Sequence, residues 1–560
     1  MIPDLDNPAL REDKFFQTIR PIAAASLRGV ASWEKFLLAI DSPDGYLWKI
    51  TPASDTATII NPHHCSAFMG ATGLAIADDT LWYIKGRDIY FCSLKEDWIP
   101  RYFTSLPYSA EGIAVWESTI YVTCNRTGEI LVFAKENARE ITRLYAPGIG
   151  GEHITVKGEE LWLCDAIEQT VYCLDRATGE VHFSILTPFE NPTGITFHTD
   201  SVTGKEILYV AYANYEPYIR DNPNANPNHE IEYRDRTFIH PLHFHFYKQE
   251  NYALSNGYLV EMCYVEELAP LEDNLEVEDL EWHIALPAET QRQEIVKVEP
   301  VGLPFTEKII EGQRVAVFKF DKLTAQDRYV FGWKATLKLW SIKYQLQPQH
   351  WDKLPDLPPD FQERYLVDND DLAMDTPIIR ASAREAVGEA TNLLQKMYNI
   401  RNYVYDRLSY GIKPHIDTPD VTLRRGVGSC GEYLGVLLAL SRLNGIASRT
   451  VGRYKCPPQP ELRHVPLQPD FNHVWMEFYL PGFGWLPMES NPDDIFEGGP
   501  YPTRFFMGLA WYHAEMAKGI PFEKLLSQGQ PVDKEKLSLG ELAINKVQFT
   551  ILEELEAFRE

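Results

Sequence analysis

The chain has 560 residues, too many for one compact core, so we expect three or four domains. Apolar residues make up 45% and charged residues 24%, which is typical of globular proteins, and no stretch of about eighteen apolar residues predicts a membrane span. The formal net charge of −27 repels phosphate backbones and argues against nucleic acid as a partner, although it suits a basic partner or simple solubility equally well.

A repeat with a period near 40 residues runs through residues 1–268. Each copy opens with a short apolar strand followed by a second one, as in Gly112-Ile-Ala-Val and Thr119-Ile-Tyr-Val. The openings lie at Gly29, Gly73, Gly112, His153 and Gly194. Such periods, with several strands per unit, are typical of β-propeller blades. The pattern resembles the calcium-dependent lactonase and NHL-type propellers, so we expect a propeller of five or six blades.

Three polar residues stand at the starts of blades: Glu111, Glu152 and His153. They allow a lactonase-like site, although polar loop residues in such places are more often simply solvated. A turn-rich stretch, Asp221–Glu230, is predicted to be an insertion between strands. It leads to His240, His243 and His245, which either bind a metal or belong to an aromatic loop that packs on the propeller.

The sequence pattern changes after residue 268. Residues 269–353 alternate apolar and polar side chains, as in Arg314-Val-Ala-Val-Phe-Lys-Phe, which predicts antiparallel strands and a small, purely structural β-sandwich. A linker rich in proline and aspartate then opens a segment of helical period, and we expect an α+β core over residues 354–515. Residues 516–560 are predicted to form a C-terminal helical tail.

One of the eight cysteines lies at a predicted helix start. Ser429 and Glu432 have the spacing of a capping box before an apolar run, so Cys430 takes the first helical position. There the helix dipole stabilises a thiolate, and the free N–H groups of the first turn can receive an oxyanion. The other cysteines mostly lie in apolar runs typical of buried residues. This helix start favours Cys430 as a nucleophile over a structural thiol.

A histidine and a glutamate follow on two predicted strands. Residues 474–480 alternate, and a Pro-Gly turn then reverses the chain towards Glu489. The hairpin brings His473 and Glu489 close together, although a slip of one residue in register turns Glu489 to the other face. If they meet, Glu489 accepts from one ring nitrogen and leaves the other facing the thiol.

These motifs together resemble the transglutaminase-like superfamily, whose core is papain-like. The resemblance rests on Gly426-Val-Gly-Ser-Cys430, on Leu443-Asn-Gly-Ile-Ala-Ser-Arg449 and on His473-x-Trp475-x-Glu477 continuing to Glu489. It implies that Cys430 is the nucleophile, His473 the base and Glu489 the third member, where aspartate is more common. The implied chemistry is acyl transfer from an amide, and a calcium-dependent crosslinking type is not indicated.

We therefore expect a thiol-dependent amide hydrolase, a peptidase or deamidase acting on a protein or peptide, with the propeller binding a substrate or partner protein. Transfer to an amine, or a non-catalytic propeller scaffold, are the alternatives. The first residues lack a basic head followed by an apolar run, so we expect no secretion signal and a cytoplasmic location with reduced thiols. We expect no cofactor, no nucleic-acid partner and no membrane partner.

Overall fold

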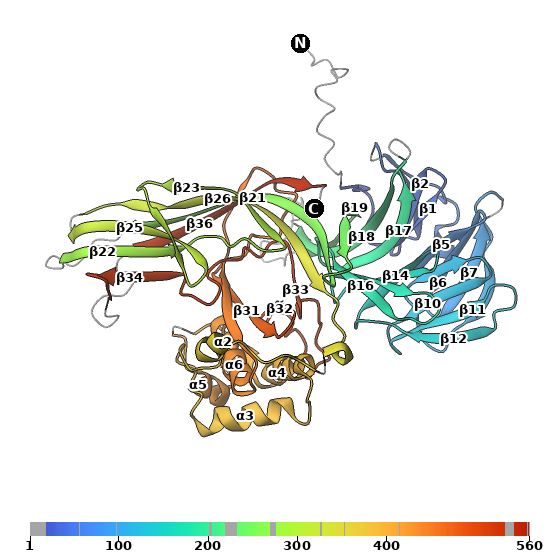
Figure 1. The fold of residues 1–560 in the computed structure, drawn as a ribbon. Coiled ribbons are helices and arrows are strands. Elements are labelled where there is room, and N and C mark those ends of the chain that lie inside the picture. Colours follow the sequence, from blue (N-terminus) through green and yellow to red (C-terminus); the bar gives the residue numbers. More distant parts are fainter. Residues whose placement is uncertain are drawn as a thin grey trace, which may run out of the picture. The chain divides into compact units, whose positions relative to one another are not determined.

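The structure is a computed structural model. It describes residues 18–558 apart from 55, 97, 201–203, 219–231, 269–275, 325–326, 352, 414, 533–542 and 557. The chain forms two compact units: residues 1–255 with 502–504, and residues 256–501 with 505–560 (Figure 1). The predicted insertion Asp221–Glu230 lies outside the described residues. Within the described ranges, no helix is both long and apolar enough to cross a membrane.

The first unit is a β-propeller whose described blades are antiparallel sheets. The first two blades contain β1 (Leu27–Trp33), β2 (Phe36–Asp41), β3 (Tyr46–Thr51) and β4 (Thr56–Ile59), then β5 (Ala71–Ala77), β6 (Thr80–Lys85), β7 (Asp88–Ser93) and β8 (Arg101–Ser105). The next two contain β9 (Ile113–Trp116), β10 (Thr119–Cys124), β11 (Glu129–Ala134) and β12 (Glu140–Tyr145), then β13 (Gly151–Lys157), β14 (Glu160–Asp165), β15 (Thr170–Asp175) and β16 (Val181–Leu186). The fifth contains β17 (Pro192–Thr199), β18 (Glu206–Tyr218) and β19 (Glu232–Leu242). A short helix, α1 (Cys65–Phe68), follows β4.

The ring of blades closes after the fifth. The innermost strands β1, β5, β9, β13 and β17 each lie beside the next, and β17 lies beside β1. Ile19 pairs with Ile239 of β19, so a residue from before the first blade extends the fifth sheet. Of the predicted five or six blades, the described residues therefore form five.

A histidine occupies the repeat position that is glycine in the other blades. At Gly112 a Cβ would lie 2.4 Å from the carbonyl oxygen of Glu152, so close strand approach requires glycine there. The fourth blade has His153 instead, and its Nε2 lies 2.9 Å from the carbonyl oxygen of Leu74, while Ile195 N–H donates to Nδ1 at 3.2 Å. Since Leu74 belongs to the second blade and Ile195 to the fifth, the His153 ring spans the centre of the propeller.

The second unit begins with two packed antiparallel sheets. The larger has the order β23 (Gln293–Val301), β26 (Val330–Tyr344), β21 (Tyr252–Leu268), β36 (Ala543–Leu555) and β30 (Pro466–Leu467), with β33 (Gly508–Leu509) beside β26. The strand β20 (Phe244–Tyr247) pairs with residues 252–255 of β21, which belong to the first unit. The smaller has the order β24 (Thr306–Ile310), β25 (Gln313–Thr324), β22 (Glu276–Ala285), β34 (Glu523–Ser527) and β35 (Gln530–Pro531). The buried rings of Trp282 and Phe331, one from each sheet, lie 5.2 Å apart, so the sheets share one aromatic core.

The structure of the sandwich differs from two predictions made from the sequence, the helical tail and the end of the propeller. The predicted helical tail at 516–560 is wrong, because β34, β35 and β36 lie there and β36 pairs with β21 over its whole length. Long-range pairing outweighs the helix propensity of its Glu, Leu and Ala residues. The predicted end of the propeller at 268 also differs, since the apolar strand β21 passes from the first unit into the larger sheet.

The remaining core combines helices with a small antiparallel sheet. The short helix η2 (Pro348–Trp351) precedes α2 (Pro359–Tyr365), α3 (Pro377–Val387), α4 (Leu393–Arg407), α5 (Pro419–Arg425) and α6 (Cys430–Leu443). The sheet has the order β29 (Ser448–Arg453), β31 (His473–Leu480) and β32 (Gly484–Met488), and β27 (Ser409–Tyr410) pairs in parallel with β28 (Val427–Gly428). Residues 433–440 of α6 are almost all buried, so this helix packs against β31 and β29 while also contacting α3, α4 and α5 (Figure 1).

Candidate active site

The structure places Cys430 at the first position of α6. Ser429 precedes the helix in an extended conformation, and its N–H donates to the Glu432 carboxylate at 2.8 Å, as a capping box requires. Arg425 also binds Glu432, which is buried, so the start of the helix is held by both a hydrogen bond and an ion pair. The half-buried Cys430 thiol therefore sits where the helix dipole favours negative charge.

The hairpin register puts His473 and Glu489 on one face. Met476 pairs with Met488, so continuing the antiparallel register sets Glu489 opposite Trp475, on the face that His473 shares two residues away. His473 Nε2 lies 2.7 Å from Glu489 Oε2, and both side chains are almost fully buried. The structure thus brings together all three residues singled out from the sequence.

The thiol and the imidazole perturb each other. Burial of Cys430 raises the pKa of its thiol, but the hydrogen bond with His473 and the charge of that ring outweigh burial and leave the thiol pKa below its ordinary value. Burial of His473 acts to lower its pKa, but the Glu489 charge and the hydrogen bonds with Cys430 and Glu489 raise it overall. Since Nε2 faces Glu489, Nδ1 is the nitrogen left for the thiol. Both shifts favour a thiolate–imidazolium pair.

Two further side chains reach Glu489, and the sequence patterns did not single them out. His513 Nε2 lies 2.5 Å from Glu489 Oε1, and Lys455 Nζ lies 3.3 Å from the same oxygen. Burial raises the pKa of Glu489, but the charges of His473, Lys455 and His513 hold it well below its ordinary value. A lone histidine in an apolar segment and a lysine at a strand end carry no motif that could have identified them.

An exposed apolar side chain lies next to the start of α6. Ile416 lies against Gly431, next to Cys430, because a Cβ built on that glycine would be 3.2 Å from Ile416 Cδ1. Ile412 and Ile416 are 72% and 75% exposed, and Tyr410 is 46% exposed. Apolar side chains this exposed are informative when they gather at one place. They offer an apolar contact for a chain that approaches Cys430.

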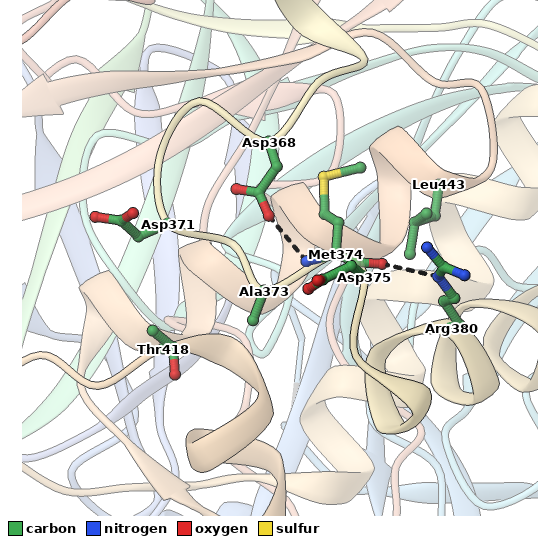
Figure 2. Close-up of a pocket in the computed structure, with 8 residues that line it drawn as sticks. All are labelled: Asp368, Asp371, Ala373, Met374, Asp375, Arg380, Thr418 and Leu443. Atoms are coloured by element: carbon green, nitrogen blue, oxygen red, sulfur yellow. Dashed lines mark hydrogen bonds between the residues drawn. The ribbon is translucent and has the colours of Figure 1, made fainter.

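Two cavities are lined by residues other than Cys430, His473 and Glu489. A cavity of about 660 Å³ is lined by Asp368, Asp371, Asp375 and Arg380, and it reaches Leu443 at the last residue of α6 (Figure 2). Because α6 has 14 residues, its two ends are about 20 Å apart, so this cavity is separate from Cys430. A second cavity of about 460 Å³ is lined by residues of the β31–β32 hairpin, Glu477 and Trp485 among them.

The polar residues of the propeller are engaged in other ways. Glu111 accepts from Asn125 N–H at 2.9 Å, and Glu152 lies 3.9 Å from Arg28, with burial raising the pKa of Glu152 to about 7. Both nitrogens of His153 contact the backbone. His240 Nδ1 lies 3.0 Å from Thr18 Oγ1. Among the described residues, no three His, Cys, Asp or Glu side chains are grouped closely enough to hold a metal ion.

The other thiols differ from Cys430. All eight cysteines lie in the described part of the chain, and none of them forms a disulfide. Cys456, which the sequence places near the site, is fully buried, and burial raises the pKa of its thiol above the ordinary range. Only Cys65 and Cys263 are half-buried like Cys430, which makes them natural internal controls.

Fold and site together define a thiol-bearing transglutaminase-like domain. Residues 380–490 match the model of the Transglutaminase-like superfamily, and this range contains Cys430, His473 and Glu489. The match supports an enzyme that uses a cysteine. It covers the α6 helix and the β29–β31–β32 sheet but not His513.

Solved structures of two kinds are similar to parts of the chain. A candidate cysteine protease from Cytophaga hutchinsonii aligns at 15% identity and TM-score 0.38, over 54% of this chain and 93% of its own. The calcium-binding protein regucalcin from Agrobacterium tumefaciens aligns at 11% identity and TM-score 0.27, over 40% of this chain and 95% of its own. Streptogramin B lyase aligns at 15% identity and TM-score 0.25, over 35% and 65%. No curated protein sequence matches the chain.

Proposed function

We propose that the protein is a thiol-dependent amide hydrolase, a peptidase or deamidase, that acts through Cys430, His473 and Glu489. The observation that carries this proposal is the 2.7 Å contact between His473 and Glu489, next to a thiol seated at the start of α6. A buried carboxylate, an imidazole and a low-pKa thiol are the groups that amide acyl transfer needs.

The reaction follows from these positions. The Cys430 thiolate attacks the amide carbonyl, the S–C bond forms, and the oxyanion faces the free N–H groups of the first turn of α6. The His473 imidazolium gives its proton to the leaving amine as the C–N bond breaks. Water then attacks the thioester, His473 takes its proton, and the S–C bond breaks to release the acid and restore the thiolate. Glu489 orients His473 and balances its charge throughout.

A protein or peptide is the substrate class we propose. The exposed apolar side chain of Ile416, which lies against Gly431 next to Cys430, suits an apolar residue near the scissile amide. The propeller, whose centre is filled by His153, is proposed to bind the substrate or a partner protein on its outer surfaces. The cytoplasm remains our proposed location, because a reducing compartment keeps the eight free thiols available.

Alkylation of the native protein tests the nucleophile. The full chain is treated briefly with iodoacetamide at pH 7, and modification at each cysteine is quantified by peptide mapping. We expect Cys430, whose thiol is hydrogen-bonded to His473, to react at least about tenfold faster than the equally half-buried Cys65 and Cys263. Equal rates at the three thiols, or no change in the His473→Ala variant, would sink the proposal.

The acceptor is tested separately. The same acyl-enzyme can pass its acyl group to an amine instead of water. The protein is incubated with a glutamine-containing peptide and a labelled primary amine, and ammonia release, peptide cleavage and label incorporation are followed together. Hydrolysis predicts cleavage or ammonia release without label, whereas incorporated label would assign amine transfer. Cys430→Ala is the control for both.

A further inference from the structure

The Glu489 carboxylate of the site contacts two histidines, one with each oxygen. Glu489 Oε2 faces the Nε2 of His473 at 2.7 Å, and Glu489 Oε1 faces the Nε2 of His513 at 2.5 Å. Both rings and the carboxylate are almost fully buried, so water cannot substitute easily for either contact. Because an ionised carboxylate only accepts, the proton of His513 lies on Nε2. Burial lowers the pKa of His513 to about 4, and its other nitrogen, Nδ1, lies 3.0 Å from the carbonyl oxygen of Ala510, so both ring nitrogens are held.

A glutamate needs this second contact more than an aspartate does. Glu489 has one more rotatable bond than the aspartate that is common in such sites, so its carboxylate can swing further from His473. A donor on Oε1 fixes the plane of the carboxylate and therefore the direction in which Oε2 meets the imidazole. Lys455 also contacts Oε1, but at 3.3 Å and from a long side chain that is one-quarter exposed. His513 is the closer and more rigid donor.

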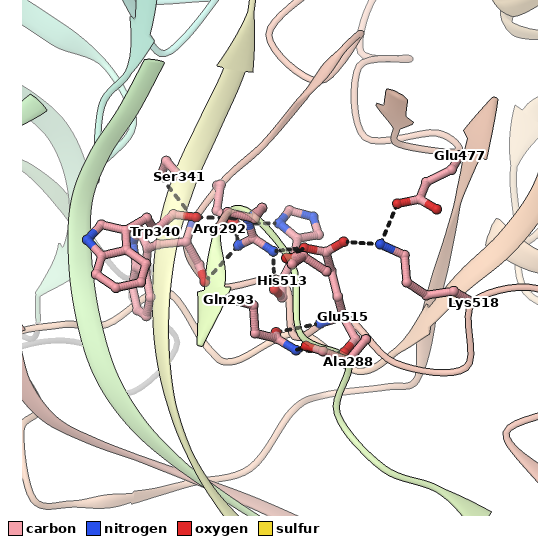
Figure 3. Close-up of polar contacts among 12 residues, drawn as sticks. Ala288, Arg292, Gln293, Trp340, Ser341, Glu477, His513, Glu515 and Lys518 are labelled. Carbon is pink, nitrogen blue, oxygen red and sulfur yellow. Dashed lines mark hydrogen bonds and ion pairs between the residues drawn. The ribbon is translucent and has the colours of Figure 1, made fainter. Parts of the chain in front are cut away.

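The sandwich in turn fixes His513. Arg292, fully buried at the start of β23, donates to the carbonyl oxygen of His513 at 2.8 Å and to the Glu515 carboxylate at 3.0 Å (Figure 3). Arg292 also donates to the Ala510 carbonyl oxygen at 2.8 Å, so one guanidinium holds the backbone on both sides of the ring. The edge of the ring packs on Trp475, with the centroids 5.0 Å apart. The His513 ring therefore cannot turn away without breaking several buried contacts.

We propose that His513 is a positioning residue of the thiol site: its Nε2–H holds Glu489 so that the other carboxylate oxygen orients His473. This proposal rests on the proposed function, because it assigns a fourth member to the same site. It also gives the sandwich a role in positioning the thiol site, because Arg292 of the sandwich holds His513. The sequence predicts a purely structural sandwich. His513 lies outside the range 380–490 that matches the family model.

Two substitutions of equal length isolate the hydrogen bond. His513→Gln keeps an N–H donor for Glu489, whereas His513→Met fills a similar volume without one. The rate of iodoacetamide modification of Cys430 is measured in the full-length protein from pH 5 to pH 9 for both variants. We expect the Met variant to react about tenfold more slowly at pH 7 and its pH midpoint to move upwards, while the Gln variant stays within about threefold of the wild type.

The controls separate a local effect from a loss of fold. His283→Gln and His283→Met change another buried histidine, which contacts Glu281 at 3.0 Å in the sandwich, and we expect neither to alter Cys430. Thermal unfolding of each variant shows whether the chain is intact. Equal rates and equal midpoints for the Gln and Met variants at 513 would overturn the proposal. A wild-type Cys430 no more reactive than Cys65 would instead overturn the proposed function.

Discussion

The pKa values of two buried histidines in this molecule, His153 and His473, are shifted in opposite directions. His153 fills the centre of the propeller and contacts only backbone groups, and burial lowers its pKa to about 4. His473 is almost as buried in the core, yet its pKa is raised, because Glu489 lies 2.7 Å from its Nε2 and the Cys430 thiol is its other partner. Burial therefore leaves His153 a neutral structural link, whereas at His473 the Glu489 charge and the hydrogen bonds with Cys430 and Glu489 together outweigh burial.

The protonation behaviour of each ring suits a different role. His153 joins the second, fourth and fifth blades, which a glycine at the same repeat position cannot do. Its neutral state suits that role, since a charge there would lack a partner. His473 must instead gain and lose a proton during a reaction. The carboxylate that permits this is held by two more groups, His513 and Lys455.

The largest expected effect comes from removing the charge that distinguishes the two rings. In Glu489→Gln the contact geometry can persist, but the pKa of His473 falls towards the behaviour of His153. We expect the alkylation rate of Cys430 at pH 7 to drop by about 10²- to 10⁴-fold. The surface substitution Glu497→Gln, at an exposed position in the same segment, serves as the control and leaves the rate unchanged. An unaltered rate in Glu489→Gln contradicts the comparison.

The matching change in the propeller affects stability and not reactivity. His153→Ala leaves a cavity and strands the N–H of Ile195, so we expect the free energy of unfolding of the propeller to fall by about 3 kcal/mol. Cys430 is expected to react as in the wild type. Chemical denaturation followed together with alkylation checks both parts, with exposed His182→Ala as the control. A loss of thiol reactivity in intact protein would show that the two roles are not separate.

Glu266, a buried carboxyl group, extends the comparison from histidines to an acidic side chain. Burial, together with the nearby Glu523 carboxyl, raises the pKa of Glu266 well above its ordinary value of 4.5. The folded state therefore keeps a proton that the unfolded chain loses, and the free energy of unfolding falls as pH rises above 4.5. We expect Glu266→Gln to remove this loss and to raise the Tm at pH 8 by about 2–4 °C.

Another glutamate of the same strand provides the control for Glu266→Gln. Glu261 of β21 is partly exposed and lies 3.1 Å from Lys334, so Glu261→Gln is expected to leave the Tm at pH 8 almost unchanged or slightly lower. Thermal unfolding at pH 5 and pH 8 distinguishes the two variants. If Glu266→Gln gives no gain at pH 8 relative to pH 5, the carboxyl group is ionised in the fold.

The smallest expected effect concerns Lys455. Its charge helps to lower the pKa of His473, against the raising effect of Glu489. Lys455→Met is therefore expected to shift the upper limb of the alkylation pH profile slightly towards higher pH, because the imidazolium persists longer. The shift should be smaller than any caused by Glu489→Gln. Lys546→Met, at a largely exposed lysine of β36, is the control, and a downward shift in Lys455→Met would be inconsistent with this account.

Much of the fold and part of the candidate site can be predicted from the sequence. The repeat of near 40 residues predicts the propeller, and a capping box before an apolar helix predicts where Cys430 lies, because both signals are local. The register of the hairpin was open, and Met476 pairing with Met488 resolves it. His513 could not be predicted, since its contact with Glu489 spans 24 residues and depends on how Arg292 of the sandwich holds the backbone.

The misassigned tail has a similar cause. Residues 543–555 contain enough Glu, Leu and Ala to suggest a helix, but they pair with β21, a strand almost 300 residues earlier in the chain. Their buried positions Phe549 and Ile551 are separated by the half-buried Thr550, a period of two that the charged residues obscure. Pairings between distant segments leave only such weak marks in a single sequence.

Strand β36 also sets the order in which the molecule can be completed during synthesis. It lies between β21 and β30 and hydrogen-bonds to both, so residues 466–467 and 257–268 have no shared partner until residues 543–555 have emerged from the ribosome. Chains fold from the N-terminus as they are made, so the propeller can form early, while the larger sheet of the second unit is completed only when β36 has been made.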